Sequence, residues 1–273
     1  MKSQPLPYAD QFRILDAQTH IASERVEAYR SGPQMRTLYP VNTGEQLIAL
    51  LDETGVDKAL ALTPCLVGSG EFLDPNHEQS NEVIAREVKK FPDRLVGAAR
   101  VNPNYGTRAV EMLRYAVETL RLRALKLHPI CEFFYPSHPY LPPLFEVANE
   151  YDIPVLIHTD EGPLTNAAGY LDLAQDFPNV PVVLYHLGGP NAVQVAKRAP
   201  NVFLETSFAY QIHILGAARA LGPERVIFGS DVPFNSPVPE IMKVTTIPDT
   251  LLSHEAKQLI LGGNMARLLK IDL

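Results

Sequence analysis

Histidine and acidic side chains follow several short apolar runs of this sequence, in the segments DAQTH, KLH, IHTD, YH and GSD. These segments contain His20, His128, His158, His186 and Asp231. Neutral imidazole nitrogens and carboxylate oxygens are good ligands for zinc and other divalent transition metals. A metal with an open coordination position lowers the pKa of its bound water to about 7. A single histidine is more often a core or surface residue, so the metal hypothesis depends on these residues converging.

The apolar runs alternate with amphipathic helical patterns along the chain. Thr43–Thr54 predicts a helix in which Thr43 and Gln46 form a capping box and Gly55 ends the helix, and Thr107–Leu120 predicts another. Strands that alternate with helices pair in parallel. The predicted strands are Arg13–Leu15, Lys58–Leu62, Leu95–Val101, Ala124–Leu127, Val155–Ile157, Val182–Tyr185, Val202–Leu204 and Val226–Phe228. Eight such units in 273 residues predict one α/β domain, 1–273, folded as a single (β/α)8 TIM barrel.

A barrel of this kind would bring the polar residues together. The carboxyl ends of its strands meet at one face, where the loops that follow the strands form the active site. Residues two apart on a strand share a face, so Gln18 points the same way as His20, and Lys126 the same way as His128. The loop 21–42 after the first strand is long, and length at this face favours a functional role over decoration.

Composition limits the partners and the compartment. A formal net charge of −7 argues against a nucleic-acid partner, because phosphate binding needs a basic patch. No apolar run is long enough to span a membrane, and MKSQPLPYADQFRILD lacks an apolar signal core, so we expect a soluble cytoplasmic protein. Cys65 and Cys131 do not make a disulfide framework, and we expect two free thiols. We expect a small-molecule substrate, and the sequence leaves a homo-oligomer open.

The strand-end motifs resemble those of the amidohydrolase superfamily. ILDAQTHI is similar to the first-strand motif, in which an aspartate precedes His-x-His. ALKLHP, PVLIHTD, PVVLYHLGG, VFLETS and VIFGSDVPF resemble strands four to eight of the amidohydrolase-related branch. That branch includes aminocarboxymuconate-semialdehyde decarboxylase, resorcylate-type decarboxylases and pyrone-dicarboxylate lactone hydrolases. The likeness runs from about Ile14 to Leu269 and implies a TIM-barrel enzyme.

The resemblance implies a role for each matching residue. His20 and His158 would be metal ligands, Asp231 would be a ligand or the general base, and His186 would hydrogen-bond the metal-bound water or a substrate oxygen. Gln18 replaces the first histidine of His-x-His, but its side chain can still offer a carbonyl oxygen to a metal. Resorcylate-type relatives have Glu-x-His at this place, and some lactonase relatives are metal-independent. Losing an imidazole should lower metal affinity or favour harder ions. We expect one divalent metal ion, with zinc as the first candidate.

Three further residues are candidate substrate contacts. Lys126 stands where binuclear members of the superfamily carry a carboxylated lysine, and here we expect a substrate-facing ammonium or a structural ion pair. His128 either lines the pocket or forms a structural turn with Pro129. Arg100 either holds a substrate carboxylate through two hydrogen bonds or pairs with a strand-end acid.

Hydrolysis is the leading functional prediction. The substrate would be an ester, lactone or amide of a small cyclic or carboxylated molecule, with Asp231 moving the proton and His186 stabilising the oxyanion. The alternative is a metal-dependent, non-oxidative decarboxylase of an aromatic or muconate-type acid, in which a strand-end acid protonates carbon. The third hypothesis is a non-catalytic, ligand-binding barrel that has lost its metal at Gln18. Only decarboxylation releases carbon dioxide, and the fold alone does not choose among the three.

Overall fold

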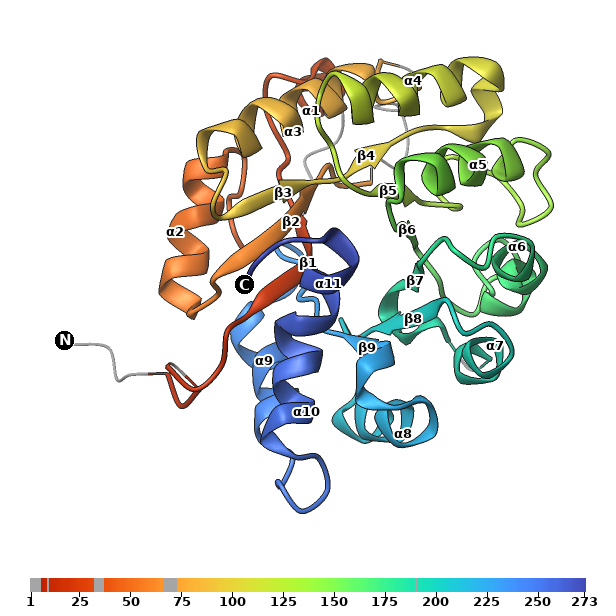
Figure 1. Cartoon of the computed structure of the whole chain (residues 1–273). Coiled ribbons are helices and arrows are strands. Elements are labelled where there is room, and N and C mark those ends of the chain that lie inside the picture. Colours follow the sequence, from red (N-terminus) through yellow and green to blue (C-terminus); the bar gives the residue numbers. More distant parts are fainter. Residues whose placement is uncertain (1–5, 9, 32–36, 66–72, 190) are drawn as a thin grey trace.

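The chain folds into a (β/α)8 barrel, in which helices surround a ring of parallel strands (Figure 1). The computed structural model describes residues 6–8, 10–31, 37–65, 73–189 and 191–273. The strands are β1 (Leu15–His20), β2 (Lys58–Leu62), β3 (Leu95–Gly97), β4 (Ala99–Arg100), β5 (Leu125–Leu127), β6 (Val155–Ile157), β7 (Val182–Leu184), β8 (Val202–Glu205) and β9 (Val226–Ile227). The helices are α1 (Glu27–Ser31), α2 (Gly44–Thr54), α3 (Glu78–Lys90), α4 (Thr107–Glu118), α5 (Leu141–Tyr151), α6 (Leu171–Asp176), α7 (Ala192–Arg198), α8 (Gln211–Leu221), α9 (Pro237–Thr245), α10 (His254–Gln258) and α11 (Asn264–Leu269).

The third predicted strand, Leu95–Val101, is divided into β3 and β4 at Ala98. β3 pairs with β2, whereas β4 pairs with β5. The Ala98 N–H donates to the carbonyl of Ala61 (2.9 Å), and the Ala99 N–H donates to the carbonyl of Ala124 (2.8 Å). Consecutive residues therefore bond to opposite neighbours, and the ring continues through this point. β3 and β4 together are the third strand of the barrel.

The barrel closes between β1 and the segment that follows β9. The His20 N–H donates to the carbonyl of Val232 (2.8 Å), and the Asp231 N–H donates to the carbonyl of Gln18 (2.9 Å). These bonds keep β1 in the ladder as far as His20, whereas the sequence predicts a strand only over Arg13–Leu15. The polar residues of the first motif therefore lie within the strand and not beyond its end.

The two ends of α2 have the predicted capping residues. The Thr43 hydroxyl accepts a hydrogen bond from the backbone N–H of Gln46 (3.3 Å), and α2 ends at Gly55, whose φ is 69°. The predicted N-terminal cap and stop of this helix are confirmed.

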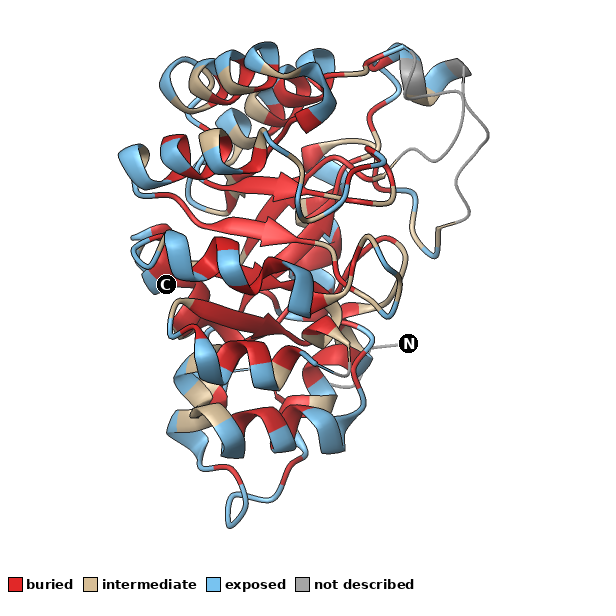
Figure 2. Cartoon of the chain, turned by 90° about the vertical axis from the view of Figure 1, so that its right-hand side faces the viewer, coloured by how far each residue is buried: buried red, intermediate tan, exposed pale blue. Residues whose placement is uncertain are grey.

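The helices turn their apolar faces toward the barrel. Figure 2 shows buried strands and helices that are exposed only on their outer faces. None of the helices among the described residues combines the length and the apolar character needed to cross a membrane.

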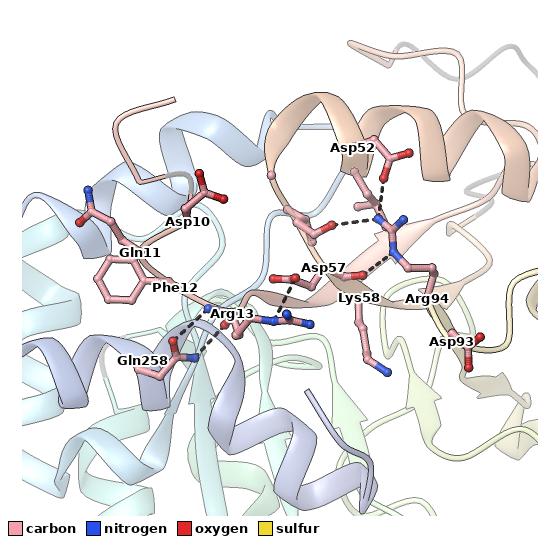
Figure 3. A pocket seen from close by; sticks show the side chains of 13 residues that line it. Asp10, Gln11, Phe12, Arg13, Asp52, Asp57, Lys58, Asp93, Arg94 and Gln258 are labelled. Carbon is pink, nitrogen blue, oxygen red and sulfur yellow. Dashed lines mark hydrogen bonds and ion pairs between the residues drawn. The ribbon is translucent and has the colours of Figure 1, made fainter. Parts of the chain in front are cut away.

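A cavity of about 710 Å³ opens at the amino ends of β1 to β3, opposite the polar strand ends (Figure 3). Arg94 pairs there with Asp52 (2.7 Å), and Arg13 pairs with Asp57 (3.1 Å). The side-chain amide of Gln258 forms two hydrogen bonds with the backbone of Arg13, at 2.8 and 2.9 Å. Residues at this face of a barrel generally serve stability. We assign the cavity lining to anchoring the N-terminal segment on α10.

A buried ion pair connects the end of β4 with the segments that follow β2 and β5 at the opposite face. Arg100 pairs with Glu132, and its guanidinium also donates to the carbonyl of Pro64 (2.6 Å). Glu132 lies 3.1 Å from His77 Nε2 and accepts a hydrogen bond from the backbone N–H of His128 (2.8 Å). Burial opposes the ionisation of Glu132, but Arg100 and His77 hold the pKa of its carboxyl below the ordinary value. Glu132 therefore joins the loops that follow β2 and β5 to the end of β4.

Glu132→Gln keeps the volume of the side chain but leaves the Arg100 guanidinium buried without an anion. We expect the free energy of unfolding, measured by denaturant titration, to fall by about 3–5 kcal/mol. Glu150→Gln is the matched control, because Glu150 pairs with Arg114 on the exposed surface (2.7 Å). Such surface pairs contribute about 0–1 kcal/mol. Equal losses in the two variants would contradict the role assigned to Glu132.

Candidate active site

Asp231 is the centre of a polar cluster at the carboxyl ends of the strands. It follows β9 with φ 62°, and it is 8% exposed. Its Oδ1 lies 2.9 Å from Nε2 of His20 and accepts a hydrogen bond from the side-chain amide nitrogen of Gln18. Aspartate and asparagine adopt a positive φ more readily than most other residues. The backbone therefore turns this carboxylate toward β1.

Gln18 connects Asp231 to a second set of hydrogen-bonded side chains, which consists of Ser207, Glu205 and His186. The Ser207 hydroxyl lies 3.2 Å from the amide oxygen of Gln18, 2.8 Å from Oε2 of Glu205 and 2.8 Å from Nδ1 of His186. Glu205 is fully buried, and burial raises the pKa of its carboxyl to about 8. Gly229 leaves room for this carboxyl, because a Cβ at position 229 would collide with it. The glycine of the GSD motif is thus required by close packing.

His158 and His186 form a separate pair. Nδ1 of His158 lies 3.0 Å from Nε2 of His186, and Nε2 of His158 lies 3.9 Å from a carboxylate oxygen of Asp160. In the hydrogen bond between the two rings, one nitrogen donates and the other accepts, and the tautomer of each ring sets which one does so. Burial lowers the pKa of His158 to about 2 and that of His186 to about 4, so both rings are neutral.

Lys126 points into the same region from β5. It is 2% exposed, and its ammonium has no hydrogen-bond partner among the described residues. The ammonium lies 3.5 Å from the centre of the Tyr185 ring. Burial lowers the pKa of Lys126 to about 7, although the nearby Asp231 carboxylate favours the charged form. Lys126 is therefore available to pair with an anion that enters the site.

The structure brings some of the expected metal ligands together. Gln18, His20 and Asp231 are in contact, and the amide nitrogen of Gln18, not its oxygen, faces Asp231. His158 contacts His186 instead. Within the described ranges, the ligand atoms of His20, His158 and Asp231 do not all lie within 4.8 Å of one another.

The other expected substrate contacts have protein partners. The guanidinium of Arg100 is held by Glu132 and by the carbonyl of Pro64, which matches the structural alternative for this residue. The ring of His128 stacks on that of His158, with centroids 3.9 Å apart. Residues 32–36 of the loop 21–42 lie outside the described residues.

Asp16, Glu205 and Ser207 belong to the cluster but were not predicted as site residues. Oδ1 of Asp16 accepts hydrogen bonds from the backbone N–H groups of Ser230 (2.9 Å) and Gln18 (3.0 Å), and it thereby joins the first and last strands. Burial raises the pKa of Asp16 to about 7. These residues carry the same signal as the predicted ones, a polar side chain within or directly after an apolar strand.

Cys65 and Cys131 form a disulfide, with their Cα atoms 6.0 Å apart. The prediction of two free thiols is therefore wrong. The cysteines are 66 residues apart in the sequence and lie in the loops after β2 and β5. These loops are held together by Arg100, which donates to Pro64 in one loop and pairs with Glu132 in the other.

The comparisons with known proteins identify a family and a set of similar folds. A family model described as amidohydrolase matches residues 66–271. No curated protein matches the chain. 5-Carboxyvanillate decarboxylase from Sphingomonas paucimobilis is 17% identical with a TM-score of 0.75, covering 96% of this chain and 100% of that chain.

Two further solved structures share the barrel. 5-Carboxyvanillate decarboxylase from Novosphingobium aromaticivorans, in complex with manganese and 4-hydroxy-3-methoxy-5-nitrobenzoic acid, is 16% identical with a TM-score of 0.78, covering 98% of this chain and 100% of that chain. 2,6-Dihydroxybenzoate decarboxylase from Rhizobium is 16% identical with a TM-score of 0.74, covering 95% of this chain and 99% of that chain. These likenesses confirm the fold, and the family model spans most of the sequence. The chain therefore belongs to the amidohydrolase family.

Proposed function

We propose that this protein is a metal-dependent, non-oxidative decarboxylase of a hydroxylated aromatic acid. The observation that carries the proposal is the buried Lys126, whose ammonium has no hydrogen-bond partner among the described residues. The nearby Asp231 carboxylate favours the charged form of this lysine. Decarboxylation of an acid needs a cation that receives the substrate anion and an acid that protonates carbon. Both groups are present at the face where barrel enzymes carry their active sites.

The prediction of hydrolysis as the leading function is wrong. The three similar structures described above are decarboxylases of 5-carboxyvanillate and 2,6-dihydroxybenzoate. These relatives support the alternative prediction, a decarboxylase acting on an aromatic acid. The metal of the Novosphingobium aromaticivorans enzyme is manganese, and zinc has no such support.

His20, His158 and Asp231 are the residues that would hold a divalent metal. The donors fit such an ion, because burial keeps the His158 ring neutral and the His20 ring already contacts the Asp231 carboxylate at 2.9 Å. Gln18 directs its amide nitrogen to Asp231, so it would orient this ligand unless the amide turns over. The donors are nitrogen and oxygen atoms only, a set that suits manganese. The bound ion would polarise the carboxylate and hydroxyl oxygens of the substrate.

The residues of the chain supply binding and the proton. The Lys126 ammonium pairs with the substrate carboxylate, whereas the ring nitrogens of the neutral His186 contact Ser207 and His158. Asp231 transfers a proton to the ring carbon that carries the carboxylate. The bond between this carbon and the carboxylate then breaks, its electron pair restores the aromatic ring, and carbon dioxide leaves. Asp231 regains its proton from solvent, so the reaction needs no oxidant.

Asp231→Asn is the sharpest test of the proton donor, because asparagine tolerates the φ of 62° and keeps the side-chain shape. We expect carbon dioxide release from 2,6-dihydroxybenzoate or 5-carboxyvanillate to fall by at least about a hundredfold, with an unchanged melting curve. Elemental analysis should find manganese in the wild type and less in the variant. Asp176→Asn, an exposed carboxylate at the end of α6, is the control. Wild-type turnover by Asp231→Asn would exclude Asp231 as the donor.

The pH dependence tests Lys126. Burial lowers the pKa of Lys126 to about 7, and only the protonated form pairs with the substrate anion. We therefore expect kcat/KM to be highest below pH 7 and to fall about tenfold per unit above it. Lys126→Met should raise KM and remove this inflection, whereas Lys197→Met on the exposed side of α7 should leave the profile unchanged. The same inflection in Lys126→Met would assign it to another group.

A further inference from the structure

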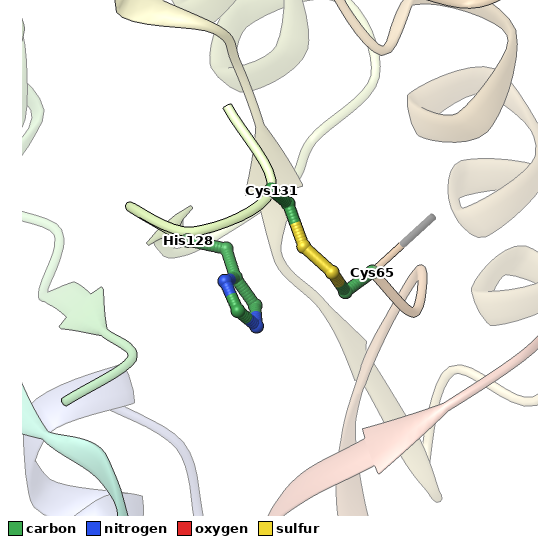
Figure 4. A group of neighbouring side chains, drawn as sticks. All are labelled: Cys65, His128 and Cys131. Atoms are coloured by element: carbon green, nitrogen blue, oxygen red, sulfur yellow. A yellow bond between two sulfur atoms is a disulfide. The ribbon is translucent and has the colours of Figure 1, made fainter. Parts of the chain in front are cut away.

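Cys65, His128 and Cys131 form a cluster beside the candidate active site (Figure 4). The ligand atoms of the three residues all lie within 4.8 Å of one another. Nδ1 of His128 is buried and has no hydrogen-bond partner among the described residues. In the part of the chain that the structure describes, this is the one group of three histidine, cysteine or acidic residues whose ligand atoms are so close.

The backbone holds two members of the cluster in a fixed turn. The N–H groups of Cys131 and Glu132 both donate to the carbonyl of His128, at 2.9 and 3.1 Å. The Glu132 carboxylate accepts the N–H of His128 (2.8 Å), and Arg100 holds this carboxylate in turn. The turn therefore keeps the His128 ring and the Cys131 sulfur on the same side, and the loop after β2 brings Cys65 to them.

We propose that the reduced protein binds one zinc ion through Cys65, Cys131 and His128, and that the disulfide is the form in which this site is closed. Zinc prefers thiolate and imidazole ligands, with Zn–S distances of about 2.3 Å and Zn–N distances of about 2.0 Å. In a tetrahedral site the two sulfur atoms are then about 3.8 Å apart, and each lies about 3.5 Å from the nitrogen atom. Zinc binding therefore requires that the two sulfur atoms, bonded to each other in the disulfide, move apart to this spacing after reduction.

A dithiol reductant supplies the electrons and protons that convert the disulfide form into the form that binds zinc. Two electrons and two protons from the reductant convert the disulfide into two thiols, and the reductant becomes a disulfide. Zinc binding then releases the two thiol protons to solvent, because thiolates are the ligands. With three protein ligands, the fourth position remains for water or for an added ligand.

The cluster is in contact with the residues of the candidate active site. The His128 ring stacks on His158 with centroids 3.9 Å apart, and His158 hydrogen-bonds to His186. A zinc ion on His128 would therefore fix one wall of the site. The zinc proposal does not depend on the decarboxylase proposal, because none of its three ligands is among His20, His158 and Asp231.

Cobalt titration of the full chain tests the thiol site separately from any site made of nitrogen and oxygen ligands. Thiolate bound to Co²⁺ gives an intense charge-transfer absorption that imidazole and carboxylate ligands do not give. We expect this band in the reduced wild type, with saturation at one equivalent of cobalt and loss of the band on addition of zinc. The oxidised wild type should not show the band. A thiol assay confirms the redox state of each sample.

Variants identify the ligands. Cys65→Ser and Cys131→Ser, reduced and with cooperative melting curves, should lose the band. His128→Asn should weaken cobalt binding by at least about tenfold. His138→Asn is the matched control, because His138 lies in the same loop but outside the cluster. The proposal is overturned if the reduced wild type gives no band, if the band is undiminished in either serine variant, if His128→Asn binds as the wild type does, or if the disulfide resists reduction in the folded protein.

Discussion

The closure of the barrel between β1 and the segment after β9 determines the geometry of the candidate active site. Backbone hydrogen bonds from Asp231 to Gln18 (2.9 Å) and from His20 to Val232 (2.8 Å) join the first and last strands. A parallel ladder fixes the register of both strands, and a shift of one residue would turn each side chain to the other face. The contact of the Asp231 carboxylate with His20 and Gln18 is therefore a consequence of closing the ring, and the long loops are not needed to create it.

Several buried ionisable groups of this closed barrel have pKa values near neutral pH, so their charged and neutral forms are similar in free energy. Burial lowers the pKa of Lys126 to about 7, and it raises the pKa of Asp16 to about 7 and that of Glu205 to about 8. One pKa unit corresponds to about 1.4 kcal/mol, so the arrival of a substrate anion can change these protonation states at a small cost. The Arg100–Glu132 pair is different, because the two opposite charges pair with each other and hold loops in place. Charges that are paired within the protein therefore support the structure. The Lys126 ammonium, which has no hydrogen-bond partner among the described residues, can instead respond to a substrate.

The sequence predicts the features that depend on local patterns. The alternation of strands and helices, and the end of α2 at Gly55, follow from periodicity and from the conformational freedom of glycine. The partners of buried side chains depend on loops that meet only in the folded chain. For that reason the sequence left two alternatives for Arg100, did not reveal Glu132 as its partner, and predicted free thiols at Cys65 and Cys131. Hydrolysis and decarboxylation use one scaffold, so the motifs did not decide between them.

The fate of the substrate carbon is the most direct test of a decarboxylase built around Asp231. The protein is incubated in D2O with 2,6-dihydroxybenzoate and with 5-carboxyvanillate, and the products are examined by proton and deuterium NMR. We predict a product in which one deuterium stands on the ring carbon that carried the carboxylate, with one carbon dioxide released for each deuterium. Recovery of every carboxylate, together with opening of an ester or lactone substrate by the same preparation, would contradict the account.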